Sequence, residues 1–166
     1  MSDFQFPLRV EKLRERLVQD NLDAIFISNA ENRRYISGFE SSAGYLILTP
    51  TDAVLCTDFR YTEQASQQAP GWRVDRIGGK PNWLADLVNE LKIKVLGFEA
   101  DDMTVDTLDR FRKSLKNNNA NPTLRPTSSI CLELRSYKDD VELALLQHAI
   151  DIGDQAFEET AAQLRV

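Results

Sequence analysis

Short runs of apolar and β-branched residues alternate with amphipathic segments along most of this chain, and this alternation restricts its fold more than any other feature. The apolar runs predict strands over residues 23–28, 45–48, 53–56, 72–77 and 94–98. The amphipathic segments predict helices that start at Pro7, Asn29, Arg60, Trp83 and Thr104. Strands that alternate with helices predict an α/β domain, with helices on both faces of a mixed sheet.

Local signals mark where several of these elements begin and end. The tetrad Thr49-Pro50-Thr51-Asp52 is rich in turn-forming residues, so the runs on either side of it are expected to form a hairpin. Asn29 and Thr104 are typical N-cap residues, and Gly38 is typical of a helix C-terminus. The hairpin would supply the antiparallel part of the sheet.

Length and composition are those of one globular domain. The 166 residues are enough for a single core, and 42% of them are hydrophobic while 28% are charged. No apolar run approaches the ~20 residues of a membrane-spanning helix. Residues 1–7 lack the basic and apolar regions of a secretory signal. We therefore expect a cytoplasmic protein without a membrane partner.

Charge and rare residues argue against several functions. The formal net charge is −6, so no overall field attracts a polyanion, and nucleic acid is not expected as a partner. His148 is the only histidine, which leaves little from which to build a histidine-rich metal site or a histidine-based catalytic triad. Cys56 and Cys131 belong to no metal-binding spacing, so both are expected to be buried thiols.

The short motifs of three enzyme classes are incomplete. No group of glycines has the G-x-G-x-x-G spacing of a dinucleotide site. Gly78-Gly79-Lys80 is followed by Pro81, where a phosphate-binding loop needs serine or threonine. Glu40-Ser41-Ser42-Ala43-Gly44 lacks the first glycine of a nucleophile elbow. These mismatches favour turns and loops over catalytic sites at both places.

The paired acids Asp101-Asp102 and Asp139-Asp140 stand beside predicted helix starts, where carboxylates interact favourably with the helix dipole. Consecutive side chains diverge, so neither pair is expected to bind a metal. One metal arrangement remains, a nuclease-like cluster of Asp58, Glu99 and Asp101 at the ends of predicted strands. The acidic surface opposes this alternative because it would repel nucleic acid.

Residues 135–166 differ from the rest because they predict one long helix, ~40 Å in length. Ser136-Tyr137-Lys138-Asp139 is a variant of the capping box, with Ser136 as the expected N-cap. Two adjoining apolar stripes run along this helix: Val141, Leu145, Ile152 and Ala156, and beside them Leu146, Ile150, Phe157, Ala161 and Leu164. The face is wider than the end of one domain would cover, so we expect a second neighbour.

Four segments resemble, in the same order, landmarks of a known family. They are residues 35–46 (YISGFESSAGYL), 55–65 (LCTDFRYTEQA), 97–99 (GFE) and 135–142 (RSYKDDVE). Together they resemble the amino-terminal domain of the creatinase, prolidase and aminopeptidase P family, over roughly residues 8–160. The resemblance implies a three-layer α/β/α fold with a mixed sheet of roughly five to six strands, similar to ribonuclease H.

The same resemblance implies how the chain is divided and what it does. Residues 1–134 would be the amino-terminal domain, and residues 135–166 a linker helix to a pita-bread catalytic domain that this sequence does not contain. In the family, two Asp, one His and two Glu of the catalytic domain bind two divalent metal ions, for which Mn, Co or Zn is expected. The parent would be a hydrolase, a Xaa-Pro metallopeptidase of the dipeptidase or aminopeptidase type. This chain would be non-catalytic, without a cofactor of its own.

The resemblance also implies partners and a substrate loop. The expected partners are the chain's own carboxyl-terminal domain and a second copy, in a homodimer. A loop of this domain would cover the partner subunit's active site, with Tyr35, Phe39, Glu40 and Ser41 as candidates; Glu40 stands where many relatives have glycine. The glycines and aromatic residues of the segment suit a partly mobile flap that carries aromatic contacts. The alternative is that the aromatic residues belong to the core, and this is favoured for Tyr45 more than for Phe39.

Two alternative roles remain open for Asp58 and Arg60. Two residues apart where a strand meets a helix, they would either form a structural charge pair or face the substrate cleft, and the first is favoured. A different class of function is a peptide- or protein-binding module of the same fold without peptidase activity. Such a module would hold its partner in the groove between Phe39 and Arg60.

Overall fold

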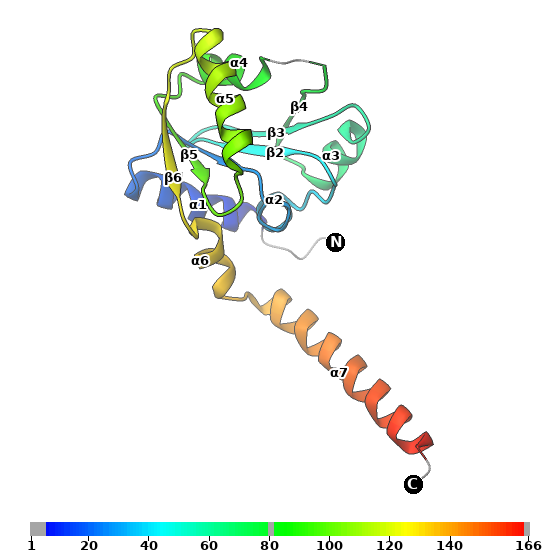
Figure 1. The fold of residues 1–166 in the computed structure, drawn as a ribbon. Helices are drawn as coiled ribbons and strands as arrows, with labels where there is room; N and C mark the ends of the chain where they lie inside the picture. The colour runs from blue at the N-terminus through cyan, green and yellow to red at the C-terminus, as the bar shows by residue number, and fades with distance from the viewer. Residues whose placement is uncertain (1–5, 80–81, 165–166) are drawn as a thin grey trace. The chain divides into compact units, whose positions relative to one another are not determined.

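The computed structural model describes residues 6–79 and 82–164, and its centre is a six-stranded mixed sheet (Figure 1). The strands are β1 (Ala24–Ile27), β2 (Tyr45–Leu48), β3 (Ala53–Thr57), β4 (Arg73–Arg76), β5 (Val95–Glu99) and β6 (Thr123–Thr127). Their order in the sheet is β4-β3-β2-β1-β5-β6. Strand β2 pairs antiparallel with β1 and β3, and the other neighbours are parallel. The expected α/β class and mixed sheet are confirmed.

Helices cover both faces of this sheet. One face carries α1 (Phe6–Gln19), α2 (Ala30–Ser37), α3 (Thr62–Gln68) and α6 (Ile130–Ser136), and the other carries α4 (Trp83–Glu90) and α5 (Val105–Asn117). Figure 1 shows α4 and α5 across the sheet from α1 and α2. The result is two apolar cores, which we call the α1 core and the α5 core, with the sheet between them.

The strands contribute to both cores because successive side chains point to opposite faces of a sheet. In β1, Ile25 and Ile27 lie in the α1 core, whereas Ala24 and Phe26 lie in the α5 core. Strands β2 and β3 alternate in the same way. Burial on both faces explains why these short strands are apolar nearly throughout.

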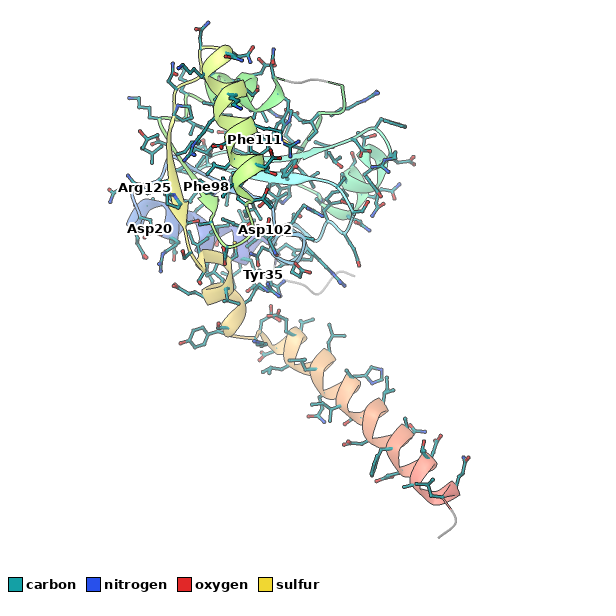
Figure 2. The ribbon with its side chains drawn as sticks, viewed as in Figure 1. Asp20, Tyr35, Phe98, Asp102, Phe111 and Arg125 are labelled. Atoms are coloured by element: carbon teal, nitrogen blue, oxygen red, sulfur yellow. The ribbon has the colours of Figure 1, made fainter. Side chains whose placement is uncertain are left out.

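Aromatic rings join the sheet to the helices of the α5 core. The Phe26 ring stacks on Tyr45 at 5.0 Å between centroids and meets Phe111 of α5 edge-on at 5.4 Å. The Trp83 ring stacks on Tyr45 at 5.5 Å and also lies 6.2 Å from the Phe26 ring. Figure 2 shows Phe111 together with Phe98 on this side of the sheet. Tyr45, although it lies in the segment with the strongest family resemblance, is therefore a packing residue.

Strand β6 and helix α6 are elements that the sequence patterns do not predict. Strand β6 has the sequence Thr-Leu-Arg-Pro-Thr. It contains a proline and no continuous apolar run, so its sequence does not predict a strand. The proline is tolerated because β6 is at the edge of the sheet. Arg125 joins this edge to the end of α1, with Nη1 donating to the Asp20 carbonyl oxygen at 2.7 Å (Figure 2).

Residues 6–134 form one compact unit, and residues 135–164 belong to another. The second unit contains α7 (Asp140–Gln163), a helix of 24 residues of which none is buried. Its capping box joins Asp139 and Glu142, whose N–H donates to Asp139 Oδ1 at 2.9 Å. The expected N-cap, Ser136, is wrong: it is the last residue of α6, and Asp139 caps instead because it has glutamate at the third helical position.

A buried carboxylate, that of Glu99 at the end of β5, joins this strand to the start of α2. Glu99 is only 2% exposed. Its Oε2 accepts the backbone N–H groups of Ser28 and Asn29, each at 2.8 Å. Its Oε1 accepts from the Asn32 side-chain amide at 2.6 Å. Burial raises the pKa of Glu99, and these donors act in the opposite direction.

The Glu99 network lies between two neighbouring strands whose following helices pack on opposite faces of the sheet. Strands β1 and β5 are parallel neighbours, but β1 leads to α2 over the α1 core and β5 leads to α5 over the α5 core. Ligands of open α/β sheets usually bind at such a point. In this protein Glu99 takes the N–H donors, and Asp102 accepts from the side chains of Ser28 and Asn29. The two acids therefore fix the start of α2.

Replacing Glu99 tests how much this network contributes to the free energy of unfolding. Glu99→Ala is expected to lower the free energy of unfolding by about 2–4 kcal/mol, because it leaves buried N–H groups of Ser28 and Asn29 without an acceptor. Glu99→Gln keeps an acceptor oxygen for them and is expected to retain most of the stability. Urea unfolding measures both variants, and equal losses would contradict the proposed role.

The raised pKa of Glu99 also predicts a pH dependence. Its contribution to stability is fully present below the unfolded pKa of about 4.3 and is lost as the pH rises through the higher folded pKa. The unsubstituted chain is therefore expected to lose stability relative to Glu99→Gln between about pH 4 and neutral pH. Urea unfolding across this range gives the difference, and the opposite slope would show that the N–H donors outweigh burial.

Candidate functional site

Residues 38–44, which we call loop 38–44, join α2 to β2 and contain three of the candidate residues. The N-cap Asn29 starts α2, with Oδ1 accepting the Asn32 N–H at 3.0 Å, and Gly38 ends it. Gly38 has a φ of +78°, and an added Cβ would lie 2.9 Å from the Phe6 ring. Glycine is therefore required where the chain enters the loop. Both predicted caps of α2 are confirmed.

Arg33 of α2 holds the loop from the inside. It is 3% exposed, and its Nη1 donates to the carbonyl oxygen of Gly44 at 2.7 Å. Its Nη2 donates to the carbonyl oxygen of Ser41. The guanidinium carbon also lies 5.9 Å from the centroid of the Phe39 ring. Burial lowers the pKa of Arg33, but an arginine keeps its proton in a protein.

Helix α3 holds the crest of the loop. The Glu40 N–H donates to Gln68 Oε1 at 3.1 Å, and Gln64 Nε2 donates to the Glu40 carbonyl oxygen at 2.6 Å. The hydroxyls of Ser42 and Tyr61 share a hydrogen bond of 2.7 Å. The side chains of Glu40 and Ser42 nevertheless remain exposed to solvent. The crest is thus fixed through its backbone and one hydroxyl while it presents polar groups outward.

Phe39 is a core residue, with no exposed surface. Its ring meets Tyr61 edge-on at 6.5 Å, and its N–H donates to Ser37 Oγ at 3.1 Å. At the far end of the loop, Thr57 Oγ1 donates to the Ala43 carbonyl oxygen at 2.8 Å. Phe39 therefore belongs to the core, and the backbone of loop 38–44 is hydrogen-bonded along its length. The partly mobile flap stays a prediction.

Tyr35 also uses its polar groups within the domain. Its hydroxyl donates to the Leu134 carbonyl oxygen at 3.1 Å, and the Arg9 guanidinium lies 4.1 Å from the centroid of its ring. Arg9 Nη1 donates to the Tyr35 carbonyl oxygen at 3.1 Å as well. Tyr35 therefore links α1, α2 and α6 and supports the base of the loop.

Asp58 and Arg60 bind each other. Arg60 Nη2 lies 2.7 Å from Asp58 Oδ2, while Nε and the backbone N–H of Arg60 donate to Asp58 Oδ1 at 3.0 and 2.9 Å. These hydrogen bonds lower the pKa of Asp58 and raise the pKa of Arg60. The Arg60 guanidinium also lies 5.2 Å from the centroid of the Tyr61 ring. The pair closes the turn after β3 and places a cation next to the loop.

The outward side of this region suits binding better than bond cleavage. Glu40, Ser42 and Arg60 are exposed, and Phe59 is 64% exposed. An acid, a hydroxyl, a guanidinium and a ring can all contact a polar ligand. The Ser42 hydroxyl is paired with Tyr61 and not with a histidine or carboxylate that could activate it.

Three residues have a clear structural role here although the sequence patterns did not single them out: Arg33, Tyr61 and Gln64. Tyr61 and Gln64 lie within segment 55–65, and its family resemblance was the available signal. Arg33 had no signal because the next residue, Arg34, is of the same type and is exposed. Only the packing of α2 separates the two arginines.

The nuclease-like cluster is not assembled. Asp58 and Glu99 follow or end β3 and β5, which are three strand spacings apart, about 14 Å. Asp58 is paired with Arg60, and Glu99 accepts N–H donors with both oxygens. Across residues 6–79 and 82–164, no group of three or more His, Cys, Asp and Glu side chains could hold a metal ion. These residues do not fit the metals that the family resemblance implies.

The two cysteines and the helices complete the survey of the described residues. Cys56 and Cys131 are both buried, as expected. Burial raises the pKa of Cys56, which keeps it protonated and unreactive. Among the described residues, no helix combines the length and the apolar character that crossing a membrane requires.

Comparison with known proteins gives consistent matches. Residues 9–137 match the creatinase/prolidase N-terminal domain family. The uncharacterized peptidase YqhT of Bacillus subtilis is 35% identical over 151 residues, which are 90% of this chain and 42% of that protein. The Xaa-Pro dipeptidase of Bacillus anthracis superposes with a TM-score of 0.89 at 33% identity, over 97% of this chain and 44% of that one.

Other structures match over nearly all of their own length, and isolated N-terminal domains are among them. The N-terminal domain of cytoplasmic peptidase PepQ from Mycobacterium tuberculosis has a TM-score of 0.70 at 37% identity, over 76% of this chain and 98% of that one. In contrast, the chain spans less than half the length of YqhT and of the Bacillus anthracis dipeptidase. This chain belongs to the creatinase/prolidase N-terminal domain family.

Proposed function

We propose that this chain is the non-catalytic amino-terminal part of a Xaa-Pro dipeptidase or aminopeptidase. The observation that carries the proposal is the superposition on a Xaa-Pro dipeptidase over 97% of this chain but only 44% of that enzyme. The remainder of the parent would be a catalytic domain that binds two divalent metal ions, Mn, Co or Zn. Metal-bound hydroxide would attack the bond before proline there. The parent would act in the cytoplasm, as the name of the PepQ relative suggests.

Helix α7 supports the proposal because its apolar side chains lack a cover. Seven large ones are 49 to 75% exposed: Leu143, Leu145, Leu146, Ile150, Ile152, Phe157 and Leu164. Apolar surface of this extent normally contacts protein. The catalytic domain would cover it, which would make residues 135–166 a linker helix and residues 1–134 the amino-terminal domain.

Loop 38–44 would meet the active site of the partner subunit in a homodimer. Its anchored backbone and its polar crest support this role, because a fixed surface can limit the length of a bound peptide. Glu40, Ser41, Asp58 and Arg60 would lie nearest the substrate. Tyr35 and Phe39 would act from inside, through the shape of the loop.

Peptidase assays test the division between the two parts. The 166-residue chain is expected to show no hydrolysis of Xaa-Pro dipeptides above a blank with added Mn²⁺, Co²⁺ or Zn²⁺, because its described residues offer no metal site. The parent protein is expected to hydrolyse them and to lose activity in EDTA. Turnover by the 166-residue chain would contradict the proposal.

The same assays separate the peptidase from the alternative. A parent without the two Asp, one His and two Glu, inactive with every metal but able to bind peptides, would identify a binding module of this fold. Titration of the 166-residue chain with Xaa-Pro peptides by calorimetry measures that binding directly.

Light scattering tests the dimer. The 166-residue chain is expected to reach the mass of a dimer at high concentration, through residues of the amino-terminal domain. The double variant Ile150→Glu and Phe157→Glu is the control, because it makes the exposed face of α7 polar. A dimer that persists in this variant supports association through the domain, whereas a strict monomer in the unsubstituted chain contradicts it.

A further inference from the structure

Arg33 is a buried cation that pairs with no carboxylate among the residues that the structure describes. Its guanidinium donates to two carbonyl oxygens of loop 38–44, those of Ser41 and Gly44. Its Nε has no acceptor among the described residues, although Arg33 is only 3% exposed. By comparison, the neighbouring Arg34 is exposed and reaches the Glu40 carboxylate at 3.4 Å. The two arginines of α2 therefore have different surroundings.

Stability alone does not explain an arginine at this position. A buried charge costs free energy unless it is paired with an opposite charge and fully hydrogen-bonded, and an apolar side chain of similar volume is often as stable or more stable. Within residues 6–79 and 82–164, Arg33 finds neither a paired charge nor an acceptor for every N–H. What it has, and an apolar residue lacks, is a pair of donors that reach the loop.

Those donors fix the loop because of the shape of the guanidinium. The group is planar and rigid, so its two Nη atoms hold the carbonyl groups of Ser41 and Gly44 at a set separation. Ser42 lies between these two residues in sequence and faces solvent. The start of α2 is itself held by Glu99 through Ser28 and Asn29. Arg33 therefore acts from a fixed helix onto the loop.

We propose that Arg33 is a positioning residue: it sets the shape of loop 38–44 and, through the loop, the fit of the peptide at the active site. The second half of this statement rests on the proposed function of the domain, and the first half does not. Arg33 does not touch substrate. Its effect is expected in substrate binding and in the mobility of the loop, with little effect on global stability.

Hydrogen exchange of the 166-residue chain tests the first half. In Arg33→Met, the amides of residues 39–44 are expected to exchange on the order of tenfold faster, because two hydrogen bonds are lost. The amides of β1 and β5 are expected to be unchanged, and the melting temperature is expected to stay within about 4 °C. Arg112→Met is the control, because Arg112 is exposed on α5 and pairs with Asp109 of the same helix; it is expected to leave the loop unchanged.

Two results would overturn the structural half. Unchanged exchange of the loop in Arg33→Met would show that other contacts suffice. Faster exchange throughout the sheet, with a large fall in melting temperature, would show that Arg33 is an ordinary core residue. Arg33→Lys provides a second check, because its ammonium can donate to the same carbonyl groups. It is expected to restore part of the protection, and failure to do so with the fold intact would count against the proposal.

Steady-state kinetics of the parent protein tests the second half. Arg33→Met is expected to raise KM for Xaa-Pro substrates several-fold while kcat stays within about twofold, as expected when uniform substrate binding is lost. Arg33→Lys is expected to give an intermediate KM, and Arg112→Met an unchanged one. An unchanged KM, or a loss of kcat alone, would overturn the role in substrate fit. If the unsubstituted parent has no peptidase activity, the proposed function fails, and the exchange data still decide the role of Arg33 in the loop.

Discussion

The Glu99 carboxylate holds the start of α2, the helix that leads to loop 38–44 of the candidate site. It accepts two backbone N–H groups at the start of α2 and one side-chain amide from the first turn of that helix. These N–H groups are buried, so water cannot replace the acceptor if Glu99 is removed, and leaving them without one would cost free energy. Because Glu99 belongs to β5, the central sheet itself determines where α2 begins.

The position of α2 in turn determines the position of loop 38–44. Arg33 lies one turn after Asn29 and carries the position of the helix to the loop carbonyl groups, while Gly38 lets the chain turn away. The Phe39 side chain packs in the α1 core and so attaches the loop to it. A surface held in this way pays little conformational entropy when a ligand binds, which favours selectivity. Proteins often accept a local cost of stability at functional sites, and a buried unpaired arginine is such a cost.

The sequence was informative wherever a pattern repeats. Apolar runs and amphipathic segments predicted five of the six strands and the helices between them, because burial on both faces leaves a continuous signal. Strand β6 left no such signal, since an edge strand can contain Pro126 and half-buried residues. The cap of α7 was misplaced from Asp139 to Ser136 because both residue types cap helices and only the position of glutamate decides.

The candidate site was less predictable because its key contacts involve the backbone. The sequence suggested a role for Glu99 only within a disfavoured metal cluster, whereas the structure pairs it with backbone N–H groups, which nearly every residue has. Arg33 could not be told from Arg34, and the glycines around Phe39 suggested mobility that the hydrogen bonds of the loop oppose. Family resemblance directed attention to this segment, but which side chains of the loop lie inward and which lie outward depends on packing.

Hydrogen exchange of the unsubstituted chain by NMR tests most directly whether loop 38–44 is a preformed surface. The decisive amides are those of Phe39 and Glu40, which donate to Ser37 Oγ and Gln68 Oε1. An anchored loop predicts that both exchange at least roughly a hundredfold more slowly than unprotected amides. Exchange near the unprotected rate, in a chain whose β1 and β5 amides remain protected, would contradict a preformed loop and restore the mobile flap.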